Sequence, residues 1–509
     1  MDLQLIRREM TISRDVLAEQ AEQAIDLEFT LPDYCPKIEK IIKCTLTPRI
    51  GNVSYSGSTL TADGEAQLSL LYCTAEQSGL FGYETAVQFS KSTDCKHDCD
   101  KMMITATVTP GYVNCRAVNE RKLDIHGAVM LHFKGVQNDT LDVVVGSECS
   151  SLQLRRIKTE NLENCGYASK QFIIQQDFNL PQTSGSIENI IRTNAEVSVS
   201  DCKFLADKAI VKGTLDLNIL YRNASGECET FYGSVPLEEI ADVEGVDENC
   251  YKNVQIMLCS LKIKPFTDSN GECRSMQAEA KINIDLAGSK INELEPVCDC
   301  YSVTNNLDVQ RKNIAVKTAA QQISGSHQLR EMIELGEAVG GIIDVSCDCG
   351  TIAAAFEAST LTVRGTVIAS IIAQDSQNNC ICYEKKLPFT HEFAVEPCAE
   401  HTADIKAIIS GCSYSMKSDD SIELRAQIDL SGLVCCKKQM SVVTDITADD
   451  NSQKQIGDMP AIVLYFAKPQ ESVWDIAMRY NTSVDLIMGA NGLDGDILAK
   501  DTVLLIPGI

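Results

Sequence analysis

Long stretches of the chain alternate between apolar and polar side chains. Residues 214–219 are typical, because leucine and isoleucine there alternate with threonine, aspartate and asparagine. Successive side chains of a β-strand point to opposite faces of a sheet, so this period of two predicts strands with one buried face. The same alternation occurs at 104–113, 276–286 and 422–430. The sequence therefore predicts a mainly β protein.

The alternating stretches belong to a repeated unit. A Leu-Pro pair, five residues and an Ile-Glu-x-Ile-Ile motif over 31–43 return over 180–192, and the strand at 64–72 returns at 213–221. Both correspondences have an offset of 149 residues (180 − 31 and 213 − 64). A fainter third copy, at 362–372, lies 152 residues further on (365 − 213). Solenoid repeats have periods of about 20–50 residues, so a unit of this length is a duplicated domain.

Two details of the repeat predict local structure. Ile38, Ile41 and Ile42 are spaced i, i+3, i+4, which predicts a short amphipathic helix at the start of the first module and of its copy. Glycines enter the strands at equivalent places, which predicts a bulge or a close backbone approach there: Gly64, Gly213 and Gly365. We expect β-sandwich-like modules, each with a short helix.

The expected organisation has six parts: an N-terminal segment at 1–24, modules at 25–150, 170–290 and 310–440, a linker at 441–459, and a small domain at 460–509. The linker is rich in aspartate, asparagine and glutamine and lacks residues that would pack a core, so it is expected to be flexible.

The C-terminal domain has a different pattern. An apolar strand is predicted at 462–467, helices at 473–480 and 484–489, and a returning strand at 502–507. This order is a small α+β (βααβ) domain.

This segment resembles a LysM domain. The matching residues are Tyr465, Ser472-Val473-Trp474-x-Ile476-Ala477, Tyr480-Asn481-Thr482-Ser483-Val484, Leu486, Asn491-Gly492-Leu493 and Leu505-Ile506-Pro507. The resemblance implies binding of N-acetylglucosamine polymers such as peptidoglycan, through a turn that usually reads Gly-Asp-Thr. Here the turn reads Gln470-Glu471-Ser472, and glutamine removes the close approach that only glycine allows. Glycan binding at this turn is therefore doubtful and remains the alternative.

A second departure from the LysM pattern concerns the first strand. Tyr465 is expected to face the core, so Ile462, Leu464 and Phe466 are expected to face outward. Beside the only tryptophan, Trp474, they form a candidate partner-binding surface. The alternatives are that a neighbouring module covers these residues, or that Trp474 belongs to the core.

The repeated modules resemble SPOCS domains, mostly β units of endospore-forming bacteria, through the Leu-Pro, Ile-Glu-x-Ile-Ile and Gly-x-x-x-Leu-x-x-Leu-Tyr motifs. The third module is divergent, since it lacks the Leu-Pro pair and has Ala373 in place of tyrosine. SPOCS modules followed by one LysM domain resemble the SipL-like family of spore-coat morphogenetic proteins. The resemblance implies a non-enzymatic adaptor in the mother-cell cytoplasm, at the forespore surface. Its LysM domain would bind a SpoIVA-like coat ATPase, and the adaptor would help other coat proteins to encase the forespore.

Charge and hydropathy exclude several partners. The formal charge is −26, from 71 acidic against 45 basic residues, which repels nucleic acid. No apolar run approaches the ~20 residues of a membrane span. The first ten residues lack the apolar core of a signal peptide, so we expect a cytosolic protein.

No catalytic motif, metal site or cofactor site is predicted. Phosphate-loop, Gly-x-Ser-x-Gly and His-Glu-x-x-His motifs are absent, and the six histidines are scattered. The 23 cysteines include no Cys-x-x-Cys, although they cluster locally at 95–99, 298–300, 347–349, 380–382 and 435–436. In a reducing cytosol most are expected to be inert thiols. Late oxidative cross-linking in a durable assembly stays open.

Overall fold

The computed structural model describes residues 3–75, 79–96, 102–267, 271–454 and 462–507. The chain is mainly β, as the alternation predicts, and the only helices among these residues are two short ones near the C-terminus. No helix in the described part of the chain has both the length and the apolar composition needed to cross a membrane.

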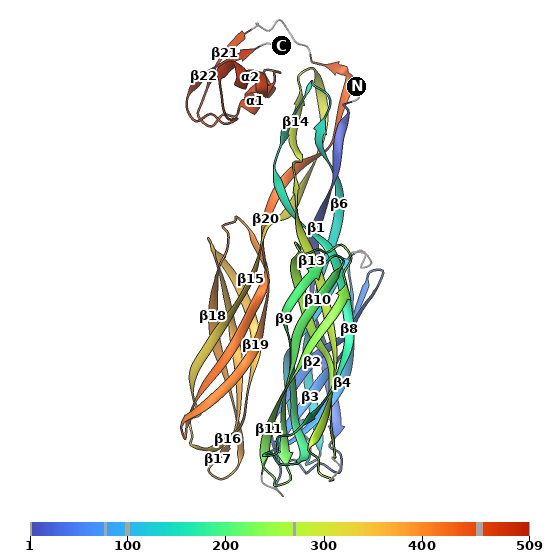
Figure 1. The fold of residues 1–509 in the computed structure, drawn as a ribbon, viewed down its shortest axis with the longest axis vertical. Helices are drawn as coiled ribbons and strands as arrows, with labels where there is room; N and C mark the ends of the chain where they lie inside the picture. The colour runs from blue at the N-terminus through green and yellow to red at the C-terminus, as the bar shows by residue number, and fades with distance from the viewer. Residues whose placement is uncertain (1–2, 76–78, 97–101, 268–270, 455–461, 508–509) are drawn as a thin grey trace.

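Within the described residues, six three-stranded antiparallel sheets form the body of the molecule (Figure 1). Three of them are built from consecutive strands, and we call them the outer sheets: β2 (Lys40–Ser56), β3 (Thr59–Cys73) and β4 (Phe81–Asp94); β9 (Ile187–Leu205), β10 (Lys208–Asn223) and β11 (Cys228–Asp242); β16 (Val339–Glu357), β17 (Thr360–Asp375) and β18 (Cys380–Ala394).

Each outer sheet packs against a second sheet, whose strands come from both sides of it in the sequence. The strand orders of these second sheets are β1 (Leu5–Thr30), β6 (Lys122–Ser147), β5 (Met102–Ala117); β8 (Thr159–Asn179), β13 (Ser275–Leu294), β12 (Tyr251–Phe266); and β15 (Asn305–Glu334), β20 (Ser421–Gln453), β19 (His401–Ser418). The same two-sheet sandwich therefore occurs three times, with its core between the sheets.

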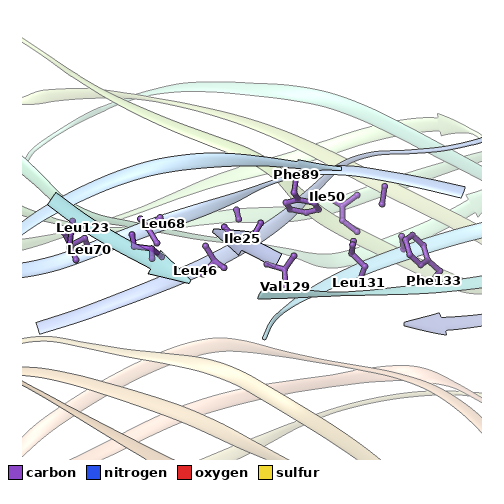
Figure 2. Close-up of a cluster of buried hydrophobic side chains, with 14 of the residues drawn as sticks. Ile25, Leu46, Ile50, Leu68, Leu70, Phe89, Leu123, Val129, Leu131 and Phe133 are labelled. Carbon is purple, nitrogen blue, oxygen red and sulfur yellow. The ribbon is translucent and has the colours of Figure 1, made fainter. Parts of the chain in front are cut away.

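Figure 2 shows the first of these cores. Leu46 and Leu68 come from the outer sheet, Leu123 and Leu131 come from β6, and all four are buried. They sit at alternate positions along their strands, as a period of two requires. Burying a leucine side chain contributes about 1.5–3 kcal/mol, so one continuous apolar layer is enough to hold two sheets together.

The short helix predicted at the start of each module is wrong. Ile41 and Ile42 lie at the start of strand β2, and Ile190 and Ile191 lie near the start of β9. The pairing register shifts at this point in both strands. In β2, for example, Ile41 faces Tyr72, and Lys43, two residues later, faces the adjacent Leu71. In a β-bulge, two residues lie opposite one partner, so two neighbouring isoleucines can both meet apolar surroundings. Over the five residues of the motif this pattern imitates helical spacing.

The glycine prediction is confirmed. A side chain at Gly64, Gly213 or Gly365 would collide with a facing backbone oxygen or with a phenylalanine ring. The strand register shifts beside each of these glycines. Bulge and close approach therefore occur together.

The bulged isoleucines bring the three outer sheets together. One apolar cluster contains Leu71, Leu220 and Ile372. The isoleucines of the bulges join it: Ile191 is one of its buried members, and Ile42 and Ile343 pack against it. Within each set of three, the spacings are 149 and 152 residues (191 − 42 and 343 − 191), the same as in the sequence repeat. Equivalent positions of the three outer sheets thus meet in one apolar cluster.

Next to this cluster, Arg192 Nη2 contacts Asp344 Oδ2 at 2.6 Å, and the two side chains are 8% and 1% exposed. Replacing Asp344 by alanine is expected to lower the free energy of unfolding by about 3 kcal/mol, because Arg192 is left buried without this partner. Urea denaturation measures the loss. The double variant Arg192→Met/Asp344→Leu should recover most of it, since an apolar pair of similar size is often neutral there. Unchanged unfolding of Asp344→Ala would contradict this account.

Two segments predicted to lie outside the modules are part of sheets. Residues 5–24 belong to strand β1 and pair with β6. Residues 441–453, predicted to be flexible linker, continue strand β20 and pair with β15. Charged and amide side chains do not prevent this, because the segment also carries buried apolar residues. Val442 packs in one apolar cluster, and Val443 and Ile446 pack in another on the opposite face of the strand. Residues 455–459 of the predicted linker lie outside the described residues.

Long strands of the three sandwiches converge into a narrow upper part, which we call the stem (Figure 1). Two apolar clusters fill it, one with Val143 and Val442 and the other with Val144 and Val443. A short two-stranded sheet, β7 (Leu152–Arg156) and β14 (Val297–Ser302), completes it. The C-terminal domain lies against this stem.

Candidate functional site

The C-terminal domain consists of β21 (Ile462–Ala467), α1 (Val473–Arg479), α2 (Val484–Asn491) and β22 (Thr502–Pro507). Serine hydroxyls cap both helices: Ser472 Oγ accepts from the backbone N–H of Trp474 at 3.1 Å, and Ser483 Oγ from that of Leu486 at 3.2 Å. Gly492 ends α2 in a left-handed conformation, with φ 63°. These caps define the loops that join the helices to the strands.

The two strands form an antiparallel hairpin with two unlike faces. Ala467, Leu504 and Ile506 point inward and are buried against α1 and α2. On the other face, Ile462, Leu464 and Phe466 are 56%, 64% and 74% exposed. The structure therefore places these three candidate residues together on an open face.

The strand register widens this surface. Ile462, Leu464 and Phe466 lie opposite Pro507, Leu505 and Val503 respectively. Directly opposed residues share a face, so all six apolar side chains line one surface, which we call the outer sheet face. Val503 is 52% exposed and the other two are half-buried. The alternation along 502–507 would have revealed this second row.

Trp474 does not belong to the outer sheet face. It is 5% exposed and packs edge-on against Tyr301 of β14, with ring centroids 4.9 Å apart. Its Nε1–H donates to Asp299 Oδ2 at 2.9 Å. The proposed extension of the exposed surface to Trp474 is thus corrected, because the stem supplies both an apolar wall and an acceptor for the indole.

Further polar contacts hold the domain on the stem. The Tyr301 hydroxyl donates to the carbonyl of Thr482 at 2.7 Å. Arg155 of β7 pairs with Asp496 at 3.1 Å. Lys454 donates to Asn481 Oδ1 and to the Ser302 carbonyl. Burial raises the pKa of the Tyr301 hydroxyl and lowers the pKa of Lys454. Sequence patterns did not point to these contacts, and those of Tyr301 and Arg155 join residues 181 and 341 positions apart.

The turn considered for glycan binding is occupied by contacts within the chain. Gln470 has a φ of 68°, a conformation that favours glycine. Glu471 accepts from the Lys468 N–H and from the Tyr465 hydroxyl, and the Lys468 N–H is the main cause of its lowered pKa. Ser472 Oγ donates to Asp496, which also contacts Arg155. Few polar groups of the turn are left for a sugar.

Comparison with known proteins finds two family models in this chain. The model described as "SipL, SPOCS domain" matches residues 186–265, which cover β9, β10, β11 and nearly all of β12. The LysM domain model matches residues 466–507, from the end of β21 to the end of β22. No curated protein and no solved structure matches the chain.

The chain therefore carries a SPOCS domain of the SipL type and a C-terminal LysM domain, the combination that the sequence motifs predict. Both are non-catalytic domain families. Together they fit a protein associated with sporulation and the spore coat that carries a LysM module.

Proposed function

We propose that this protein is a non-enzymatic spore-coat morphogenetic adaptor whose LysM domain docks a SpoIVA-like coat ATPase. It acts from the mother-cell cytoplasm at the forespore surface and brings other coat proteins into the assembly. The observation that carries the proposal is the outer sheet face, an apolar surface left open on a domain that is itself fixed to a stem.

The physical argument rests on the side chains that remain in water. Leu464 and Phe466 are the most exposed apolar residues of β21. Contiguous apolar patches on soluble domains mark sites of interaction, and aromatic anchors in such patches often carry most of the binding energy. In this proposal Ile462, Leu464 and Phe466 contact the partner directly, and Trp474 acts indirectly by holding the domain on the stem.

The contacts around the site support the non-catalytic part of the proposal. The titratable groups around it, such as Glu471 and Asp496, are engaged in caps and ion pairs within the chain. A protein-docking role requires no such group to be free.

The test of function is direct binding of the purified full chain to a purified SpoIVA-like ATPase, measured by biolayer interferometry. Saturable binding that is lost when the outer sheet face is altered supports the proposal. An intact chain that fails to bind the ATPase, and fails to recover it from sporulating cells, would overturn it.

Glycan binding is the competing function, favoured by the LysM match. We expect the full chain not to sediment with insoluble peptidoglycan, because Ser472 and Asp496 are already hydrogen-bonded to each other and Gln470 replaces the usual glycine. A bacterial LysM protein with the usual Gly-Asp-Thr turn serves as the positive control. Sedimentation that chitin oligomers compete away would favour a glycan-binding protein instead.

A further inference from the structure

Three side chains with metal-binding atoms meet at the edge of the third sandwich. They are Cys398, His401 and Cys436, and their ligand atoms lie within 4.8 Å of one another. Cys398 comes from the connection between β18 and β19, His401 begins β19, and Cys436 lies in β20. All three are partly buried, and none takes part in the LysM site.

The strand register brings two of them together. His401 lies directly opposite Cys436 in the antiparallel pair of β19 and β20, so their side chains project from the same face. Cys398 precedes His401 by three residues, the short Cys-x-x-His spacing common in zinc sites. The adjacent Cys435 points to the other face and is buried.

One nitrogen of the His401 ring is held by a hydrogen bond. Its Nε2 lies 2.8 Å from the carbonyl oxygen of Glu396. A carbonyl only accepts, so Nε2 carries the proton and Nδ1 keeps its lone pair. Metal-ligating histidines usually donate their other N–H in this way, which fixes the tautomer and the ring plane. Stacking on Phe356, at 4.6 Å and 8° between the planes, holds the ring further.

We propose that Cys398, His401 and Cys436 form a zinc site that fastens the β18–β19 connection to strand β20. Binding Zn²⁺ releases the thiol protons of Cys398 and Cys436 and involves no change of oxidation state. Three protein ligands leave a fourth tetrahedral position for water.

Cys398 and Cys436 are joined as a disulfide in this structure, with Cα atoms 5.9 Å apart. The zinc site forms once a thiol or phosphine reductant has returned both to thiols, and the disulfide is the competing state. A disulfide involves only the two cysteines, whereas a zinc site with two thiolates and an imidazole uses His401 as well. Two other thiol pairs, Cys165–Cys250 at 3.3 Å and Cys347–Cys412 at 3.0 Å, form no such three-residue group with any described residue, and the second pair serves as the control.

The test measures metal in the full chain purified with a phosphine reductant and Zn²⁺, then desalted. Elemental analysis should find about one zinc per chain. Cys398→Ser, His401→Ala and Cys436→Ser should each lose it, while Cys347→Ser and Cys412→Ser should retain it. Cobalt substitution gives a second readout, because thiolate-to-cobalt absorption should weaken in the Cys398 variant and persist in the Cys412 variant.

Folding is checked separately by far-ultraviolet circular dichroism, and His401→Ala is the mildest of the three variants because it keeps both thiols. Zinc content that is the same in all five variants would overturn the proposal. So would a Cys398–Cys436 disulfide that mass spectrometry still detects after purification with reductant and zinc.

Discussion

The double variant Leu464→Arg/Phe466→Arg is expected to lose binding to the SpoIVA-like ATPase by at least about thirtyfold. Losing one well-packed anchor costs about 2 kcal/mol, and two arginines also place charge in an apolar contact. Both side chains point into solvent, so the stability of the domain should change by no more than about 0.5 kcal/mol per residue. The dissociation constant and the thermal unfolding midpoint are measured on the same preparations.

The matched control for this variant lies on another sheet. Ile240 of β11 is also an exposed apolar residue, at 55%, and is far from the LysM domain in the chain. Ile240→Arg should leave the affinity unchanged. Equal affinities for the double variant and the control would remove the outer sheet face from the mechanism.

Tyr301→Ala is expected to release the LysM domain from the stem without unfolding it. The change removes the ring that packs on Trp474 and the hydroxyl that donates to Thr482. Tyr301 belongs to the stem, so every residue of the LysM domain itself stays unchanged. Truncating a buried aromatic residue typically costs about 3–5 kcal/mol, enough to undo docking of a small domain. Trp474 is the only tryptophan, so its fluorescence emission reports the event directly and should shift to longer wavelength.

A second variant separates docking from folding. Asp299→Ala removes the acceptor of the indole N–H but keeps Tyr301, so a smaller shift in the same direction is expected. Small-angle scattering should show a more extended particle for Tyr301→Ala. If its emission spectrum and scattering profile match those of the unchanged protein, the stem does not hold Trp474 as described.

Local patterns predicted the elements best where one face was buried and the other open. The alternation along β10 and β21 gave both strands and their inward faces, since a period of two is decided within a few residues. The Ile-Glu-x-Ile-Ile motif misled because a strand with a bulge and a turn of helix can both place three isoleucines over five positions against apolar surroundings. Only pairing with β3 distinguishes the two.

For the candidate site too, local patterns predicted some features and long-range contacts decided others. The exposure of Ile462, Leu464 and Phe466 followed from strand alternation and the LysM resemblance, whereas the place of Trp474 depended on Asp299 and Tyr301. Those partners lie more than 170 residues earlier in the chain (474 − 301). No local period carries information about a contact of that range.

The sequence by itself determined the β character, the repeat spacing and the two domain families, because each is written in periodicity or in a contiguous motif. The tertiary structure decided which faces stay open. It placed the isoleucines of the repeated motif where the three outer sheets meet. It also held the LysM domain on the stem and paired His401 with Cys436 across two strands. The physical reason is that burial is a property of two surfaces, and the second surface comes from a distant part of the chain.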